Sequence, residues 1–303
     1  MIALLLGLLT AAVALLADQL LILPADQADQ ARALQTMARL QAGIERDLNA
    51  LSTAAAGLAG WDETYQFISA PETEYLRRNL NPETMSTLQT HFILFYNQQG
   101  ELIHAQGYDY RAGVELTVPP TLLERLTPDN RLLSQPDRFT RGLMLLPEGP
   151  LLIAGRGILP SDRQGPIRGT VVCARWLGDQ LQQLSTSENL ALTLYRADQP
   201  PDPLPPRLES LWVGNRQLEA ALEITPSSEL ISWQQLRDLE GKPAAIIRLT
   251  QPRLLFQQAR MSRLQLAGGF ALVGGLAGML LYIFLDHRFR LEEKRISLEH
   301  GES

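Results

Sequence analysis

Two long apolar blocks lie near the ends of the chain. The first covers residues 1–23 and is interrupted only by Asp18 and Gln19, and the second covers residues 264–285. A helix of about 20 apolar residues is long enough to cross a hydrocarbon core roughly 30 Å thick. The pattern therefore predicts a transmembrane helix in each block and a folded domain over residues 24–263 between them.

The two blocks differ in character. The second is rich in glycine, which is common where membrane helices approach each other closely, at Gly268, Gly269, Gly274, Gly275 and Gly278. The first has no Lys or Arg before it. A cleavable signal peptide is the alternative interpretation of the first block, but the block is long for one and lacks a basic start.

The residues after the second block set the expected orientation. A basic cluster follows it, made of His287, Arg288, Arg290, Lys294 and Arg295. Such clusters are retained on the cytoplasmic side of a membrane. We therefore expect residues 286–303 to be a cytoplasmic linker stub, too short for a catalytic domain. The domain between the blocks is then expected in the periplasm, anchored in a bacterial inner membrane.

A helical stripe opens the region between the blocks. Apolar residues recur there at spacings of three and four, at Leu34, Met37, Leu40, Ile44, Leu48, Leu51, Ala55 and Leu58. This spacing places one apolar face along a long helix. The face either packs on the protein's own domain or pairs with a second subunit, so a homodimer is expected but not required.

After Tyr75 the pattern changes to short apolar runs bounded by turn residues. Such runs predict strands over 91–96, 101–105, 151–159, 169–176, 217–224, 230–236 and 244–249. Helical patches are expected at 120–126 and 177–184. A Pro-rich stretch at 199–207 is interpreted as a loop within the same domain. A long helix followed by a mainly antiparallel sheet predicts an α+β fold of the PAS-like kind.

Composition argues against several classes of function. The net charge of -6 and the pI near 5.4 do not favour a nucleic-acid partner, which would need a concentrated basic surface. One cysteine, Cys173, allows no intrachain disulfide, and the histidines lack metal-ligand spacing. No cofactor, metal or catalytic constellation is therefore expected in these residues.

The most informative cluster follows the first long helix, at Trp61, Asp62, Thr64 and Tyr65. If the helix continues through it, Trp61 and Tyr65 share a face and wall a ligand pocket, with Asp62 as a polar contact. The alternative is that the aromatics close the core and Asp62 anchors a neighbouring backbone.

Two strand arginines are further candidate ligand-binding residues, Arg156 and Arg175. Either guanidinium is suited to an anionic ligand. A solvated or salt-bridged strand face is the alternative interpretation of both.

Around the Trp61 cluster and beyond it, the sequence resembles the fourth class of CHASE domain, an extracellular sensor. The resemblance covers most of residues 30–255 and is carried by Trp61, Asp62, Thr64, Tyr65, Phe67, Asn81, Phe92–Phe95, Gly100, Gly165-Pro166, Gly169-Thr170, Arg175, Asp238, Gly241-Lys242-Pro243 and Pro252-Arg253. The chain departs from the family pattern at His91, Asn97 and Gly157, where the family often has Asn, Asp and Pro. These departures limit what can be borrowed about the ligand.

The resemblance implies a signal-transduction receptor. Its periplasmic domain would sense an unidentified small molecule or peptide and transmit through the second transmembrane helix. The output would be a histidine kinase, as in two-component systems, or a diguanylate cyclase or phosphodiesterase of cyclic-di-GMP signalling. None of these is present in the chain. The alternative is a non-catalytic module for protein–protein interaction or assembly in the cell envelope.

Overall fold

The computed structural model describes residues 12–13, 15–136, 139–188, 190–225 and 229–299. The chain forms two compact units. The larger unit contains residues 33–225 and 231–251. The smaller unit contains residues 1–32, 226–230 and 252–303. Each unit is described separately below.

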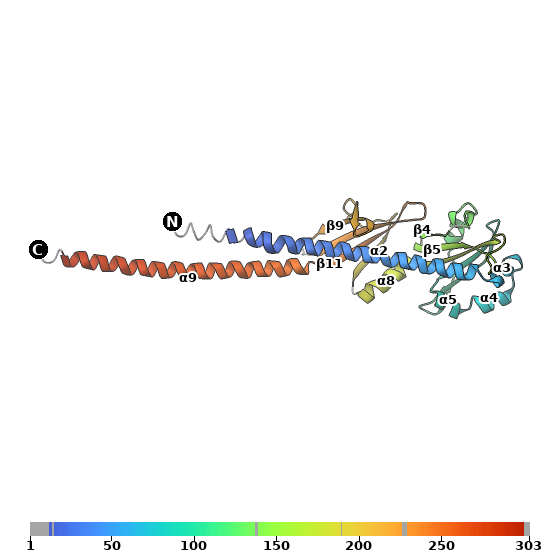
Figure 1. The fold of residues 1–303 in the computed structure, drawn as a ribbon, viewed down its shortest axis with the longest axis horizontal. Coiled ribbons are helices and arrows are strands. Elements are labelled where there is room, and N and C mark those ends of the chain that lie inside the picture. The colour runs from blue at the N-terminus through green and yellow to red at the C-terminus, as the bar shows by residue number, and fades with distance from the viewer. Residues whose placement is uncertain (1–11, 14, 137–138, 189, 226–228, 300–303) are drawn as a thin grey trace. The chain divides into compact units, whose positions relative to one another are not determined.

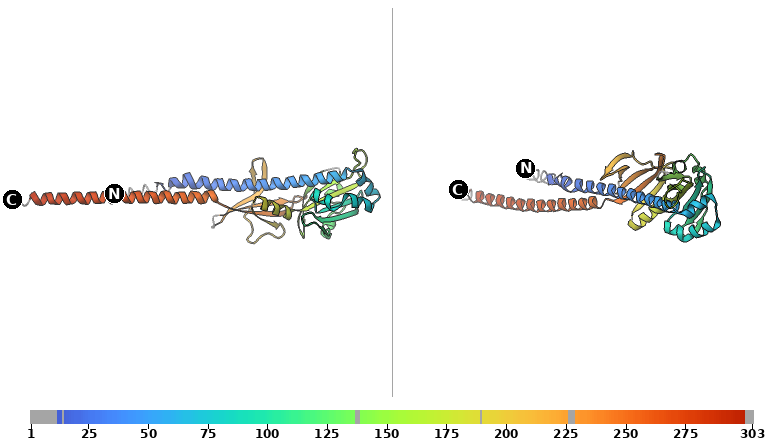
Figure 2. Two further views of the ribbon diagram at one scale, coloured as in Figure 1. Left: turned by 90° about the horizontal axis from the view of Figure 1, so that it is seen from below. Right: turned by 45° about the vertical axis from the view of Figure 1, so that its right-hand side comes forward.

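A long helix, α2 (Leu23–Ala59), runs along the sheets of the larger unit, as Figures 1 and 2 both show. Every residue of the predicted apolar stripe is buried except Leu34, which is partly exposed. The stripe belongs to the core of the protein itself, where Met37, Leu51 and Ala55 are fully buried. The stripe therefore packs on the protein's own sheets.

The first sheet has six strands in the order β3-β2-β1-β6-β5-β4. Their bounds are β1 (Phe92–Asn97), β2 (Leu102–Asp109), β3 (Val114–Leu116), β4 (Thr140–Leu146), β5 (Gly149–Gly157) and β6 (Gly169–Trp176). The two predicted pairs, β1 with β2 and β5 with β6, are present and antiparallel. The β1–β2 hairpin lies beside β6, β5 and β4, which follow it in reverse chain order. This is the PAS-like strand order, so the predicted α+β fold is confirmed.

Short helices cover this sheet or connect its strands. They are α3 (Asp62–Ser69), α4 (Thr73–Asn79), α5 (Pro82–Leu88), α6 (Pro120–Arg125), α7 (Arg131–Ser134) and α8 (Leu177–Glu188). One face of the sheet, including Ile93 and Phe95, shares a core with α2. The opposite face, including Phe92 and Leu94, packs against residues of α6 and α7 such as Leu122.

The second sheet has five strands in the order β7-β11-β10-β9-β8. Their bounds are β7 (Ala191–Arg196), β8 (Glu209–Val213), β9 (Arg216–Ile224), β10 (Glu229–Arg237) and β11 (Pro243–Pro252). Leu218, Leu236 and Ile247 from one face join the core that contains the α2 stripe. Both sheets thus share one helix and one hydrophobic core.

The pocket interpretation assumed that the long helix continues through the cluster at Trp61. The helix does not continue there. Helix α2 ends at Ala59, and Trp61 is extended, with φ -87° and ψ 133°. A new helix, α3, begins at Asp62. Gly60 lies between the two helices, and glycine is a poor helix former, which accounts for the break. Trp61 and Tyr65 therefore do not share one face of a continuous helix.

The smaller unit contains η1 (Asp18–Ile22), the start of α2 and helix α9 (Leu254–Glu299). Figure 2 shows α9 side by side with the start of α2, and Arg263 forms an ion pair of 2.9 Å with Asp18. Within the described residues, one helix segment, Leu254–Leu291, is long and apolar enough to cross a membrane. Most of the first apolar block lies outside the described residues, so its prediction stays untested.

Candidate functional site

The Trp-Asp-x-Thr-Tyr cluster anchors a loop. The Asp62 carboxylate accepts hydrogen bonds of 2.8 Å from the backbone N–H and from the hydroxyl of Ser161. These two bonds lower the pKa of Asp62. The Tyr65 hydroxyl donates to the carbonyl oxygen of Pro166 at 3.2 Å. The cluster therefore fixes both ends of the loop over residues 160–168.

The other side chains of the cluster have structural contacts too. Arg168, from the same loop, lies 3.9 Å above the Tyr65 ring and donates to the Ser69 hydroxyl. The Thr64 hydroxyl is buried and bonded to the Tyr75 hydroxyl at 2.7 Å. Trp61 is 42% exposed and does not close the core. The geometry favours the anchoring interpretation for Asp62, and Tyr65 is partly buried against the core.

The two candidate arginines differ in their surroundings. Arg175 is 2% exposed, and its Nε donates to the Gln89 carbonyl while its Nη1 lies 3.8 Å from Asp47. It joins β6 to α2 and to the end of α5. Arg156 stacks on Phe139, with its guanidinium carbon 3.1 Å from the ring centroid. Burial, aided by the nearby charge of Arg163, lowers the pKa of Arg156.

None of the five candidate residues lines the groove of about 680 Å³ that is described below. Asp62 and Tyr65 contact the loop over residues 160–168, and Arg175 contacts α2. Arg156 stacks on Phe139, which lines that groove. Their role as ligand residues stays a prediction.

Two of the departures from the family pattern have clear structural reasons. The Gly157 N–H donates to the Pro136 carbonyl at 3.0 Å, and a Cβ there would lie 2.7 Å from that oxygen. A proline at 157 would lack this donor. The Asn97 side-chain oxygen accepts from the N–H groups of Gln99 and Glu101, and its amide donates to the Glu101 carboxylate at 2.7 Å, a bond that an aspartate could not make.

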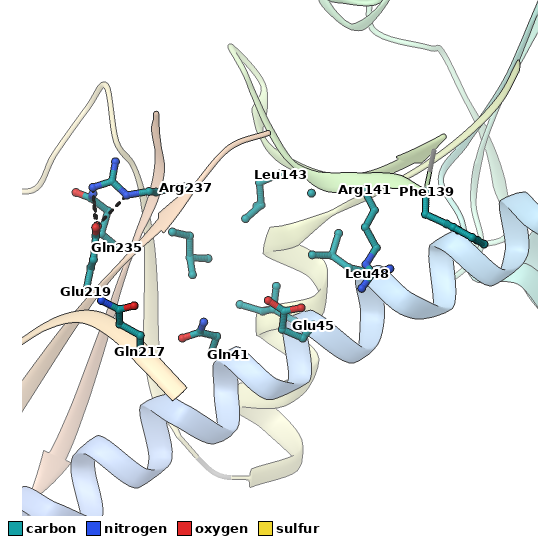
Figure 3. A pocket seen from close by; sticks show the side chains of 13 residues that line it. Gln41, Glu45, Leu48, Phe139, Arg141, Leu143, Gln217, Glu219, Gln235 and Arg237 are labelled. Carbon is teal, nitrogen blue, oxygen red and sulfur yellow. Dashed lines mark hydrogen bonds and ion pairs between the residues drawn. The ribbon is translucent and has the colours of Figure 1, made fainter. Parts of the chain in front are cut away.

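A groove of about 680 Å³ lies between α2, β4 and the strands β9 and β10 (Figure 3). It is lined by Gln41, Ile44, Glu45, Leu48, Phe139, Arg141, Gly142, Leu143, Gln217, Glu219, Gln235, Leu236 and Arg237. Ligand sites in proteins commonly measure about 300–1,000 Å³. The groove contacts both sheets and the helix that they share, and all its lining residues belong to the larger unit.

Charged and amide side chains dominate the groove. Arg237 and Glu219 form an ion pair of 2.7 Å, and Gln235 donates to Glu219 at 2.8 Å. Glu45 from α2 and Arg141 from β4 have neither an ion pair nor a hydrogen bond among the described residues. A polar ligand would find both an unpaired anion and an unpaired cation.

A hairpin of the second sheet contacts the edge strand of the first. The turn between β10 and β11 is folded by the Asp238 carboxylate, which accepts from the N–H groups of Glu240 and Lys242. At its tip, the Leu239 N–H donates to the Leu143 carbonyl at 3.0 Å. A Cβ on Gly142 would lie 2.6 Å from the Leu239 side chain, so this contact requires glycine or movement of the leucine.

A junction in the smaller unit joins the start of α2 to the start of α9. The Asp29 carboxylate accepts from the N–H groups of Leu255 and Phe256, at 3.4 Å and 2.9 Å. These N–H groups lie in the first turn of α9, where helical donors lack partners. Arg253 forms an ion pair with Asp26 and stacks on Phe256 at 3.7 Å. We call these contacts the α2–α9 junction.

Sequence comparison assigns the family. A model of the CHASE4 domain matches residues 43–195. This chain belongs to the CHASE4 domain family. The match spans the C-terminal part of α2 from residue 43, all of the six-stranded sheet and β7 up to residue 195. It therefore includes Glu45 and Arg141, whereas the β9 and β10 side of the groove lies beyond it.

Individual relatives of this CHASE4 chain include a regulatory histidine kinase. It is 28% identical over 247 residues to the methanogenesis regulatory histidine kinase FilI of Methanothrix harundinacea, covering 80% of this chain but 27% of FilI. Two solved structures resemble it more distantly. The extracellular domain of a protein described as histidine kinase vpHK1S-Z8 is 14% identical and covers 77% of this chain and 98% of its own, with a TM-score of 0.48.

The second solved structure is the sensor domain of the Vibrio cholerae histidine kinase DctB. It is 10% identical and covers 75% of this chain and 98% of its own, with a TM-score of 0.44. Because both scores are low, the fold of this CHASE4 chain rests on its own strand order and on the family match.

Sequence reasoning missed the groove. Glu45 lies one position outside the apolar stripe and looks like an ordinary exposed helix residue. Arg141 lies in β4, a strand that the pattern did not predict. No local signal in the sequence places these two residues together, because their approach depends on how both sheets pack on α2.

Proposed function

We propose that this chain is the sensing and membrane-anchoring part of a signal-transduction receptor. Residues 24–263 sense an extracytoplasmic ligand, and α9 carries the response across the membrane to a cytoplasmic output. That output, a kinase or a cyclic-di-GMP enzyme, lies outside the chain. The membrane is a bacterial inner membrane with the sensor in the periplasm, and the receptor is a homodimer.

One observation carries the proposal most directly, the α2–α9 junction. Strand β11 ends at Pro252, and α9 begins two residues later, at Leu254. At this point Asp29 caps α9 and Arg253 pairs with Asp26. Because Asp29 and Arg253 are buried, a change in the path of β11 or α2 is expected to move the first turn of α9.

A chimera tests this coupling. The catalytic portion of a histidine kinase is joined after Ser303 at junctions that scan one heptad, and a fusion with measurable autophosphorylation is chosen. Loss of a capping side chain costs about 1 kcal/mol, enough to shift a two-state equilibrium about fivefold. Asp29→Ala is therefore expected to change basal autophosphorylation several-fold, and Asp26→Ala to change it in the same direction.

Two control variants accompany the test. Asp29→Asn keeps an acceptor oxygen and should retain most of the wild-type activity, whereas Glu72→Ala, an exposed residue of the larger unit, should have no effect. Wild-type autophosphorylation in membrane-inserted Asp29→Ala and Asp26→Ala chimeras would mean that the signal does not pass through this junction.

A further inference from the structure

The groove between α2 and β4 contains two opposite charges that no described residue neutralises. Figure 3 shows Arg141 pointing from β4 toward α2, and Glu45 projecting from α2. Both side chains are exposed, and because an exposed ion pair gains little free energy, no ion pair joins them in the described part of the chain. The groove is therefore ready for a molecule that carries both kinds of charge.

The rest of the lining is electrically neutral. Glu219 and Arg237 neutralise each other through their ion pair. Gln41, Gln217 and Gln235 offer amide donors and acceptors around the charged pair. The apolar side chains of the lining are Ile44, Leu48, Phe139, Leu143 and Leu236. A suitable ligand has no net charge, two ionic groups and a small apolar portion.

The polar lining continues into the buried interface between α2 and β10. The Gln41 side-chain oxygen accepts a hydrogen bond of 2.9 Å from Gln234, which is 1% exposed. The Gln234 side-chain oxygen has no hydrogen-bond partner among the described protein atoms. Unpaired buried polar groups are costly and often mark functional sites. Gln41 thus connects the groove to a polar position beneath it.

We propose that this groove binds a small zwitterion of the α-amino acid type. The ligand carboxylate pairs with Arg141, the ammonium group pairs with Glu45, and the side chain lies over the Leu48 and Leu143 part of the lining. A simple anion would leave Glu45 unpaired, a simple amine would leave Arg141 unpaired, and a sugar would leave both. This inference rests on the proposed sensory function and names the ligand class for it.

The position of Arg141 connects ligand binding to the rest of the fold. Its neighbours Gly142 and Leu143 are the β4 residues that contact Leu239 at the tip of the β10–β11 turn. A ligand that joins Arg141 to Glu45 ties β4 to α2. The contact with the β10–β11 hairpin is then expected to change, and β11 leads directly toward α9.

The test uses the full chain in detergent micelles. Each proteinogenic L-amino acid is screened for a rise in the thermal unfolding midpoint, and binding of any that stabilises is measured by calorimetry. The expected result is binding of at least one amino acid. Arg141→Gln and Glu45→Gln should each weaken it at least about tenfold, which equals about 1.4 kcal/mol.

Arg207→Gln and Glu124→Gln are matched controls, because both residues are exposed and neither lines the groove. They should leave the affinity unchanged. The deaminated acid and the decarboxylated amine of the bound amino acid should each bind at least about tenfold more weakly than the amino acid.

Three results would overturn the inference. They are no binding by any amino acid, equal binding by the deaminated acid, and unchanged affinity in Arg141→Gln and Glu45→Gln. The chimera with Asp29 and Asp26 variants is measured without added ligand. Its result stands independently, so failure of the groove proposal is distinguishable from failure of the receptor proposal.

Discussion

At the scale of single residues, Asp62 shows how a site-like motif can have a structural role. Its carboxylate is exposed to solvent, yet it accepts two hydrogen bonds from Ser161 in the loop over residues 160–168. A carboxylate that accepts two hydrogen bonds from one residue fixes that residue's backbone. The motif that most strongly suggested a ligand pocket thus holds a loop against α3.

Replacing Asp62 separates these two roles. Asp62→Ala should leave the fold intact but raise amide hydrogen exchange in residues 160–168, because the Ser161 N–H loses its acceptor. Ser161→Ala, which removes one of the two bonds, should raise exchange less. Mass spectrometry after deuterium labelling of the full chain reports both. Exchange that stays at the wild-type level in Asp62→Ala would show that the carboxylate is not the anchor.

His91 is a second residue whose environment makes a measurable prediction. It is 1% exposed, its Nδ1 accepts from the Trp176 N–H and its Nε2 lies 3.3 Å from Asp179. Burial lowers the pKa of His91 below 6.5, although the nearby carboxylates of Asp179 and Asp109 oppose this and Arg175 and Arg111 reinforce it. Protonation of Nδ1 would also remove the acceptor that Trp176 uses.

The sign of the pH dependence follows from the lowered pKa. The unfolded chain protonates at His91 near pH 6.5, whereas the folded chain resists protonation until lower pH. The His91 contribution to stability is complete above pH 6.5 and declines as pH falls toward the folded-state pKa. The unfolding midpoint of the wild type should therefore fall between about pH 7 and pH 5.

Two variants separate the contributions of His91 and His104 to this pH dependence. His91→Gln should show a shallower fall in the unfolding midpoint than the wild type, and so should His104→Gln, since burial also lowers the pKa of His104. The slopes are compared rather than the midpoints, because either substitution changes stability at every pH. Identical slopes in all three proteins would contradict the assignment.

At the scale of elements, the sequence predicts those with a strong local pattern. The α2 stripe, the β1–β2 hairpin and the β5–β6 pair all follow from periodicity and turn residues. In each case the side chains that form the pattern are the ones that the fold buries. Asn97 and Gly100 in the first turn act as their residue types suggest, since Gly100 has a φ of 76°.

The missed strands are edge strands, and their pattern is weak for a physical reason. β4 and β8 each pair with one neighbour only, so the sheets do not require an apolar run in them. Arg141 and Gly142 interrupt β4, and Trp212 of β8 is 70% exposed. The groove depends on β4, which is why local sequence patterns did not reveal it.

The α2–α9 junction was also beyond the reach of local patterns. Asp29 and Phe256 are separated by more than 200 residues in the sequence, and Asp29 reads as an ordinary polar residue of a helix. Only the packing of α9 against the start of α2 makes its carboxylate a helix cap. Caps supplied from distant elements leave no sequence signature at the helix that they stabilise.

At the scale of the whole molecule, the features of each unit fit a receptor of the CHASE4 family. The larger unit has two sheets on one helix, with a polar groove that contacts all three. The smaller unit contains an apolar helix that begins two residues after the last strand of the second sheet. The basic residues that follow the apolar block over residues 264–285 support the proposed orientation.

The most direct test of the central claim is on which side of the membrane the second sheet and the C-terminal part of α9 lie. Trp212→Cys places a thiol at an exposed position of β8, and Arg288→Cys places one after the apolar block over residues 264–285. The native Cys173 is fully buried and burial raises its pKa to about 12, so it should stay unreactive.

Intact cells that express each variant are treated with a membrane-impermeant maleimide, before and after permeabilisation. The account predicts that Trp212→Cys is labelled in intact cells and that Arg288→Cys is labelled only after permeabilisation. Labelling of Arg288→Cys in intact cells, or protection of Trp212→Cys until permeabilisation, would contradict it.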